Sequence, residues 1–525
     1  MNARLFAAVA LATALGLGHA TVDGQAVRGG AVTGVDHHSG VDGVFAKYNP
    51  STPGCAVGVA TGGTPVLTGG YGSADLEHDV AIGPETIFEA GSVSKQFTAA
   101  AVLLLAREGK LSLDDPVRKY IPELPDYGTP LLIRHMLNHT SGLRDWGSVA
   151  GIAGWPRTSR VHTHAHVLEI VSHQKALNFT PGTRWSYSNT GFNLAAMIVE
   201  RVSGTSFQDF TRARLFQPLG MTHTSWRDDY TRIVKGRAIA YHEDRDGGAF
   251  HTDMPFENVY GNGGLLTTVG DLLRWSENFV TPVVGDASFV AEQQQPGTFA
   301  DGRTHGYALG LFVGRYKGVR EVYHSGSTAG YSAFLTRFPD SHVSVAVLCN
   351  VDTARATQYA HDVADVYLGD RVRPAASRPA ADVTAGQYRS LVTGVAVTLA
   401  RDSAAARTRA WTFDGGGRAT ATDEFGTSEG FQRVEPVKPT AADLAAYAGT
   451  YESAEAETTL TAAVENGGLV LKRRPATAIK LTPVYADAFS AGSLGTVIFR
   501  RDASSKVTAL SVVQDRVWDM RFTRR

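Results

Sequence analysis

The sequence predicts an α/β domain followed by an all-β region, and apolar segments of different pattern carry that prediction. Residues 97–105 are continuously apolar or small, and Gly109 follows as a stop signal, which is typical of a buried helix. The short apolar runs 55–59 and 343–349 are typical of buried strands. After Tyr367 come short alternating apolar runs separated by glycines, which indicate an all-β tail.

The tetrad Ser92-Val93-Ser94-Lys95 stands at the start of the apolar helical run. Residues i and i+3 share a helix face, so a hydroxyl and an amine lie one turn apart. A serine hydroxyl needs an adjacent base to act as a nucleophile, and Lys95 can be that base only as a neutral amine. Burial and the positive end of the helix both favour the neutral form. Taken alone, the tetrad is equally typical of a helix N-terminus capped by serine.

A second polar segment precedes another predicted helix. Pro181-Gly182 opens a turn that leads to Tyr187 and Asn189. An amphipathic helix is predicted after them, ending at Gly204. Both polar side chains therefore lie on a loop that enters a helix, where they can point into a cleft.

A third polar segment, residues 322–327, contains His324 and Gly326 and leads by a short turn into residues 331–335. The two segments are predicted to pair as a hairpin. A glycine on such a strand lets a substrate backbone approach closely.

Ser92-x-x-Lys95, Tyr187-x-Asn189 and His324-x-Gly326, in that order, resemble the three motifs of the serine β-lactamase and penicillin-binding protein superfamily. The closest match is the class C-like branch, which includes D-aminopeptidases, DD-carboxypeptidases and β-lactamase-like esterases. Segments 86–91, 133–143 and 263–265 agree as well, and the resemblance covers residues 35–370. It implies an antiparallel sheet flanked by helices together with an all-helical subdomain.

The resemblance and the chemistry together suggest a role for each residue. Ser92 would attack an acyl carbon, while Lys95 and Tyr187 form a coupled proton shuttle. Asn189 would hold Lys95 and the amide of the bound substrate. The backbone amides of Ser92 and Ser327 would form the oxyanion hole.

His324 departs from the Lys-Thr-Gly form of the third motif. Histidine is mostly neutral at pH 7, whereas lysine carries a charge suited to a free carboxylate. With His324 and Gly326 orienting the substrate, we expect esters, amides and D-residue peptides that lack a free carboxylate. The alternative is that His324 is a strand residue satisfied by the backbone.

We therefore expect a secreted serine hydrolase that forms a covalent acyl-enzyme on an ester, amide, D-amino-acid peptide or β-lactam. The alternative is a penicillin-binding-type receptor or sensor that retains the fold without efficient turnover. An α/β-hydrolase is disfavoured because no Gly-x-Ser-x-Gly elbow occurs. His162, His164 and His166 alternate, but they enter an amphipathic helix on which they diverge. No metal site and no cofactor is expected.

The N-terminus and the charge bear on compartment and partners. Residues 1–20 have one positive charge, a short apolar run and a small-x-small site, which predicts a signal peptide cleaved after Ala20 and a secreted or periplasmic protein. No other stretch is apolar enough to span a membrane. The formal net charge of -1 argues against nucleic acid, which leaves a small molecule or peptide as substrate. The oligomeric state stays open.

The two cysteines, Cys55 and Cys349, lie on the apolar strand-like runs. In the sheet that the resemblance implies, these strands are antiparallel neighbours. The sequence leaves a cross-strand disulfide and two buried thiols open, and we expect the thiols.

The predicted boundaries place a hydrolase domain at 35–370, a linker at 371–380 and a lipocalin-like β region at 381–525. Segments 386–390 and 449–453 form a weak repeat, so the tail is either one barrel or two units, 381–436 and 440–525. The tail either packs without chemistry or narrows the cleft with a loop, and we expect packing alone.

Overall fold

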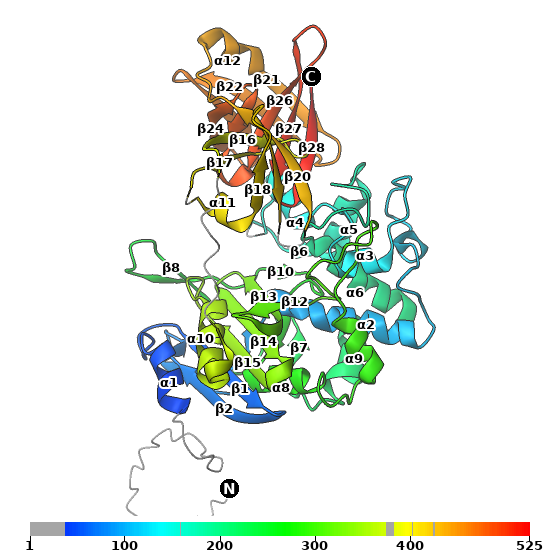
Figure 1. Ribbon diagram of the computed structural model, residues 1–525, viewed down its shortest axis with the longest axis vertical. Coiled ribbons are helices and arrows are strands. Elements are labelled where there is room, and N and C mark those ends of the chain that lie inside the picture. Colours follow the sequence, from blue (N-terminus) through cyan, green and yellow to red (C-terminus); the bar gives the residue numbers. More distant parts are fainter. Residues whose placement is uncertain (1–36, 158, 374–382, 402, 424–425) are drawn as a thin grey trace, which may run out of the picture. The chain divides into compact units, whose positions relative to one another are not determined.

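The computed structural model describes residues 37–525, except residue 158, residues 374–382, residue 402 and residues 424–425 (Figure 1). The predicted signal peptide at 1–20 and most of the predicted linker at 371–380 lie outside the described residues. Within the described ranges, none of the helices has the length and apolar character that a membrane crossing requires.

A six-stranded antiparallel sheet forms the centre of the α/β part, residues 37–373. Its strand order is β12-β13-β14-β15-β1-β2. The predicted hairpin is confirmed, because β13 pairs with β14 and Ser327 lies opposite Ser332. The bounds are β1 Cys55–Thr61, β2 Thr64–Tyr71, β12 Phe312–Tyr316, β13 Val319–Thr328, β14 Tyr331–Phe338 and β15 Val343–Cys349.

Helices cover both faces of this sheet. Side chains of a strand alternate between the two faces, so one strand contributes to a core on each side. Val57 and Val59 of β1 belong to a core with α1 (His37–Phe45) and α10 (Ala356–Leu368). Ala56 and Ala60 belong to the opposite core, which includes residues of α8 (Val269–Glu277).

A helical subdomain lies beside the sheet (Figure 1). Its central helix, α2, is buried from Lys95 to Leu105, as the apolar run 97–105 predicts. The predicted helix before Gly204 is also confirmed, and Gly204 ends it in the left-handed conformation. The bounds are α2 Lys95–Arg107, α3 Ile133–Leu137, α4 Trp146–Ile152, α5 His164–Ser172, α6 Asn189–Ser203 and α7 Phe207–Thr211.

Short strands and one further helix complete the α/β part. A three-stranded sheet has the order β5-β11-β7, and β6 pairs with β10, β3 with β4 and β8 with β9. The bounds are β3 Ser73–Asp75, β4 Val80–Ala81, β5 Phe88–Glu89, β6 His162–Thr163, β7 Ser225–Trp226, β8 Tyr241–Glu243, β9 Phe250–Thr252, β10 Glu257–Asn258, β11 Leu265–Thr267 and α9 Ala287–Gln293.

The C-terminal β region, residues 383–525, contains two separate sheets. One is five-stranded, in the order β17-β16-β20-β19-β18, and the other is a closed eight-stranded barrel, β21 to β28 (orange to red in Figure 1). The repeated segments form the first strand of each, with Tyr388 and Tyr451 buried at equivalent places. The predicted architecture is confirmed: an antiparallel sheet flanked by helices with a helical subdomain, followed by an all-β region that contains a barrel.

The bounds in this region, given in chain order, are β16 Gly386–Ser390, β17 Ala396–Leu399, α11 Ala404–Thr408, β18 Ala410–Phe413, β19 Arg418–Thr422, β20 Ser428–Val434, α12 Ala441–Tyr447, β21 Gly449–Ser453, β22 Thr458–Glu465, β23 Gly468–Arg473, β24 Thr477–Tyr485, β25 Ala488–Ser490, β26 Thr496–Arg501, β27 Val507–Gln514 and β28 Val517–Arg524.

The two cysteines form a disulfide, so the expectation of two thiols was wrong. The strands are the antiparallel neighbours that the resemblance implied. Their register places Cys55 directly opposite Cys349, with the Cα atoms 4.0 Å apart. Strand adjacency does not by itself fix the register, which is why the sequence could not decide between the two states.

The barrel is held against the helical subdomain by a largely buried ion pair. Arg144, whose side chain is 3% exposed, pairs with Glu455 of the β21–β22 turn. Arg144 Nη2 also donates to the carbonyl of Asp519 at 2.7 Å. The Glu455 carboxylate in turn accepts the backbone N–H of Lys175 at 3.0 Å.

We expect no alkylation of the native or unfolded protein by a maleimide before reduction, and two alkylated cysteines after reduction and unfolding. The reason is that the disulfide leaves no thiolate to react. Intact-mass spectrometry measures the adducts, and a Cys349→Ala variant, in which Cys55 is a free thiol, is the positive control. Two adducts on the unreduced, unfolded chain would show that the thiols are free.

Replacement of Glu455 by Gln is expected to lower the free energy of unfolding by about 3 kcal/mol, because it leaves the Arg144 charge buried without its partner. Urea unfolding followed by fluorescence measures the change. Glu457→Gln is the matched control, since Glu457 is 56% exposed and pairs with the partly exposed His173, so a change below about 1 kcal/mol is expected. Equal changes in the two variants would contradict the importance of the buried pair.

Candidate active site

Ser92 and Lys95 meet at the junction of a short 3-10 turn, Gly91–Ser94, with helix α2. In a 3-10 turn, side chains three residues apart lie nearly above one another. Lys95 Nζ is 3.0 Å from Ser92 Oγ. Ser92 is partly exposed, whereas Lys95 is completely buried. The hydroxyl is therefore accessible from solvent and its amine neighbour is not.

Lys95 connects this turn to two distant segments. Its Nζ lies 2.9 Å from Oδ1 of Asn189, the first residue of α6, and 2.6 Å from the carbonyl oxygen of Asn262. The structure thus brings the Asn189 of the second motif to the tetrad, as the sequence predicts. Asn262 was missed, although it directly precedes the Gly263-Gly264-Leu265 segment that the sequence analysis identified.

The surroundings of Lys95 favour the neutral amine. Burial, reinforced by the positive charge of Arg516, lowers the pKa of Lys95 well below its usual value. A neutral amine has two N–H donors, which the oxygens of Asn189 and Asn262 accept. Its lone pair is then left facing the Ser92 hydroxyl, which is the arrangement that a base requires.

The ring of Tyr187 lies beside the Lys95 amine. Its ring centre is 4.8 Å from Lys95 Nζ, and it stacks on the buried His139 with ring centres 4.2 Å apart. Burial raises the pKa of Tyr187 above its usual value, although a hydrogen bond with Ser92 acts in the opposite direction. The phenol is therefore held in its protonated form beside a neutral amine.

Two glycines let the third motif approach the nucleophile turn. Gly91 has φ of 50°, and a Cβ there would lie 2.6 Å from the backbone nitrogen of Ser327. A Cβ on Gly326 would lie 2.0 Å from the carbonyl oxygen of Ala90 and 3.0 Å from the nitrogen of Ser92. The sequence analysis explained Gly326 by the approach of a substrate, but the structure places the protein's own backbone there. The N–H groups of Ser92 and Ser327 consequently belong to two segments in contact.

His324 is buried behind this contact, and both ring nitrogens are engaged. Nδ1 lies 2.6 Å from the carbonyl of Ser325, and Nε2 lies 2.9 Å from the hydroxyl of Tyr307. The carbonyl must accept from Nδ1–H, so Nε2 accepts from the tyrosine. Burial lowers the pKa of His324 to about 3. The imidazole is therefore neutral, and Tyr307 is a neighbour that no sequence motif identified.

The alternating histidines do not converge. His164 Nε2 contacts the carbonyl of Tyr260 at 3.1 Å, and His166 Nδ1 accepts the backbone N–H of Thr163 at 3.1 Å at the start of α5. The backbone of His162 pairs with the backbone of Glu257, where strands β6 and β10 run parallel. The rings of His162 and His166 are nevertheless in edge-on contact with their centres 6.0 Å apart, so the expected divergence holds for His164.

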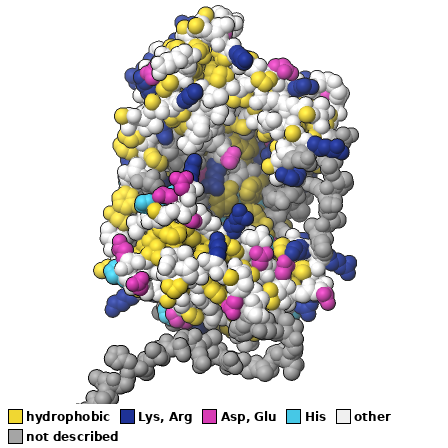
Figure 2. Space-filling model, turned by 90° about the vertical axis from the view of Figure 1, so that its left-hand side faces the viewer, with side chains coloured by type: hydrophobic (Ala, Val, Ile, Leu, Met, Phe, Trp, Pro, Cys, Tyr) yellow, Lys and Arg dark blue, Asp and Glu magenta, His cyan; other side chains and the backbone are white. Residues whose placement is uncertain are grey.

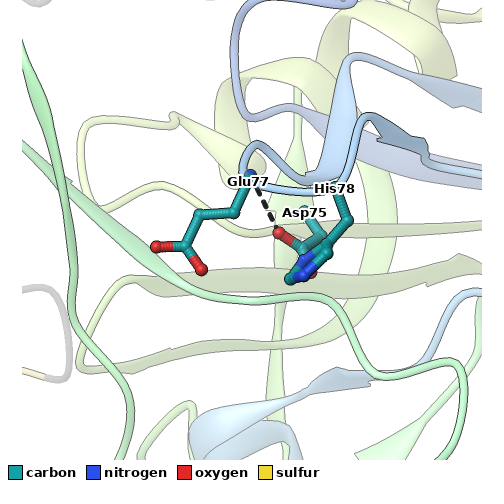
Figure 3. Close-up of side chains that lie close together, drawn as sticks. All are labelled: Asp75, Glu77 and His78. Carbon is teal, nitrogen blue, oxygen red and sulfur yellow. Dashed lines mark hydrogen bonds and ion pairs between the residues drawn. The ribbon is translucent and has the colours of Figure 1, made fainter.

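A different group, on the β3–β4 hairpin, brings carboxylates and an imidazole together. Asp75, Glu77 and His78 have ligand atoms within 4.8 Å of one another (Figure 3). His78 Nδ1 is 2.7 Å from Asp75, and the backbone N–H of Glu77 donates to the same carboxylate at 3.0 Å. These contacts describe an ion pair in a turn with largely exposed side chains.

The C-terminal barrel reaches the edge of the site. The guanidinium carbon of Arg516, in the turn between β27 and β28, lies 4.7 Å from the ring centre of Tyr187. The sequence analysis expected only packing from the tail, and no motif marked this arginine.

A beta-lactamase family model matches residues 41–368 of the 525 in the chain. The chain belongs to the beta-lactamase family. Within this family it is 28% identical over 313 residues to penicillin-binding protein 4* of Bacillus subtilis, a match covering 55% of the chain and 66% of that protein. It is 29% identical over 308 residues to a D-aminopeptidase of Brucella ovis, covering 58% and 57%. The matches therefore span less than two thirds of the length of these relatives.

Solved structures of the family share the fold. The octameric penicillin-binding protein homologue from Pyrococcus abyssi superimposes with a TM-score of 0.57 at 22% identity, covering 93% of this chain and 99% of that one. A D-amino acid amidase from Ochrobactrum anthropi gives a TM-score of 0.53 at 21% identity, covering 64% and 100%. At these identities the likeness concerns the fold alone.

We expect the rate at which Ser92 reacts with a fluorophosphonate probe to reach its plateau at a pH well below the usual pKa of lysine. The base must be deprotonated to act, and burial lowers the pKa of Lys95 well below that usual value, so the rate is lost only as the pH falls through the lowered pKa. Stopped-flow or gel-based labelling rates measure the profile.

Lys95→Arg is the control, since a guanidinium stays protonated, and we expect its labelling rate to fall by about 10²-fold to 10⁴-fold. A wild-type rate that rises steadily up to pH 10 would show instead that Lys95 is protonated at neutral pH.

Proposed function

We propose that this protein is a serine hydrolase that forms a covalent acyl-enzyme on Ser92. One observation carries the proposal: the buried Lys95 amine touches the Ser92 hydroxyl while two carbonyl oxygens occupy its own donors. The family assignment and the relatives named D-aminopeptidase and D-amino acid amidase support it. The substrates are proposed to be esters, amides or D-amino-acid peptides, with β-lactams as a further class.

In the first half-reaction, Ser92 Oγ forms a bond to the acyl carbon while its proton passes to Lys95 Nζ. The negative charge on the carbonyl oxygen is stabilised by the N–H groups of Ser92 and Ser327. The bond to the leaving group then breaks, and the leaving group takes a proton from the Tyr187 hydroxyl, which recovers it from Lys95. In the second half, water attacks the ester and the same groups move the protons back.

His324 does not take part in this proton transfer, because its low pKa keeps it neutral and both nitrogens are engaged. It is proposed to fix Tyr307, and hence the wall of the site beside His139, whose ring lies 4.6 Å from Tyr307. Residues 1–20 are proposed to be a secretory signal peptide, so that the hydrolase would act outside the cytoplasm.

Ser92→Ala is expected to abolish fluorophosphonate labelling, because it removes the only atom that forms the acyl bond in this scheme. Ser288→Ala, an exposed serine at the start of α9, is the matched control and keeps full labelling. In-gel fluorescence measures both variants, and labelling that persists in Ser92→Ala rules out Ser92 as the nucleophile.

A turnover panel then separates hydrolase from receptor. p-Nitrophenyl acetate, D-alanine amide, a D-alanyl-D-alanine peptide and a cephalosporin are compared, and we expect multiple turnovers on at least one of the first three. One equivalent of acyl-enzyme that does not turn over on any of them would instead favour a penicillin-binding-type receptor.

A further inference from the structure

A cavity of about 330 Å³ adjoins the candidate active site, and it is lined from both parts of the chain. Asn189 and Asp145 border it from the helical subdomain, and Arg516 borders it from the barrel. Arg157 and Arg473 lie in the same wall. Its volume suits a small ligand, and three guanidinium groups make the wall strongly basic. Over a wider area than this cavity, Figure 2 shows a face of the molecule that is hollowed near its middle. Lys and Arg side chains lie around the hollow.

Two of these guanidinium groups contact the protein. Arg157 forms a two-pronged ion pair with Glu257, including a 2.6 Å contact from Nε. Arg473 donates from Nη1 to the backbone carbonyls of Gly151 and Ile152 at the end of α4, while its buried Nε has no partner among the described residues. Arg157 therefore has little capacity left for a ligand, and Arg473 is tied to the end of α4 through one nitrogen.

Arg516 differs from both. Among the described residues, no acidic side chain or carbonyl group pairs with its guanidinium, which stacks on the Tyr187 ring. Its backbone is nevertheless fixed, because its carbonyl accepts from the Asp145 N–H at 3.3 Å and from Asn178 Nδ2 at 3.0 Å. The charge is therefore held in place beside the reacting groups with its N–H donors unused.

Among the described residues that line the cavity, Asp145 has the acidic side chain, and both of its carboxylate oxygens already accept hydrogen bonds. One oxygen accepts the N–H of Ser148 at 3.1 Å, and the other accepts the N–H of Asn189 at 2.8 Å. It caps α4 and anchors the start of α6, and no ion pair joins it to Arg516 in the described structure. The cavity wall therefore has more positive than negative charge, and this favours an anionic ligand.

We propose that Arg516 binds a free carboxylate of the substrate, which makes small acyl peptides with a C-terminal carboxylate the preferred class. The inference rests on the proposed function and names its substrate. A guanidinium binds a carboxylate through two parallel charge-assisted hydrogen bonds, and the stacked ring already restricts this side chain. The third motif lacks a cation because His324 is neutral, and the barrel supplies one. This replaces the expectation, drawn from His324 alone, of substrates without a carboxylate.

The test compares N-acetyl-D-alanyl-D-alanine with the same peptide ending in a carboxamide. Release of D-alanine and of D-alanine amide gives kcat/KM for each, and their ratio is the readout. We expect the wild type to prefer the acid at least tenfold, and Arg516→Gln to reduce the ratio by about tenfold to a hundredfold. Arg516→Lys keeps the charge and retains part of the preference. Arg521→Gln removes a charge from an exposed site on β28 and leaves the ratio unchanged.

Other outcomes overturn the inference. A wild type that prefers the amide, or that does not hydrolyse the acid, is one of them. An Arg516→Gln variant in which both substrates lose the same factor is another, because it assigns Arg516 to tuning of Lys95 and not to binding. Fluorophosphonate labelling of wild-type Ser92 tests the proposed function separately. A failure of the proposed function can therefore be distinguished from a failure of this inference.

Discussion

The burial of Lys95 is the constraint on which the rest of the site depends. A charged ammonium without solvent is costly, so the amine must either lose its proton or find acceptors. The fold provides both, with a site at 0% exposure and two carbonyl oxygens from distant segments. Because α2, α6 and the Asn262 loop must all meet at one nitrogen, packing errors in any of them would leave it unsatisfied. The chemistry and the folding of the helical subdomain therefore share one requirement.

The backbone contact between the first and third motifs is the second requirement. Gly91 and Gly326 are at the two closest approaches, and a side chain on either would strike the other segment. This close approach brings together the backbone N–H groups of Ser92 and Ser327, which are proposed to stabilise the oxyanion. Rigid backbone donors need no rearrangement during the reaction, which is where such a site gains most of its effect.

The sequence predicted the parts of the site that depend on local order. Ser92 and Lys95 are three residues apart on one turn, and Tyr187 and Asn189 enter a helix, so their proximity follows from local geometry once the motifs meet. The helices before Gly109 and Gly204 and the β13–β14 hairpin were predicted for the same reason. Contacts set by tertiary packing were not predictable. Asn262 acts through its carbonyl, which any residue type has, and Arg516 lies about 190 residues after the third motif in a turn without a pattern.

The disulfide between the two cysteines is another contact that the sequence could not predict. Adjacent strands were implied by the resemblance, but a shift of one residue in register would have separated the sulfur atoms on opposite faces. The structure fixes that register through the complete β1–β15 ladder.

The disulfide between Cys55 and Cys349 has a consequence for the integrity of the enzyme. Every motif residue, from Ser92 to Ser327, belongs to the stretch of chain that this crosslink closes into a covalent ring. A protease that cuts one surface loop inside the ring produces two fragments that stay joined through sulfur. The proposed nucleophile, base and oxyanion donors then remain on a single molecule after nicking, which would suit the secreted hydrolase proposed above.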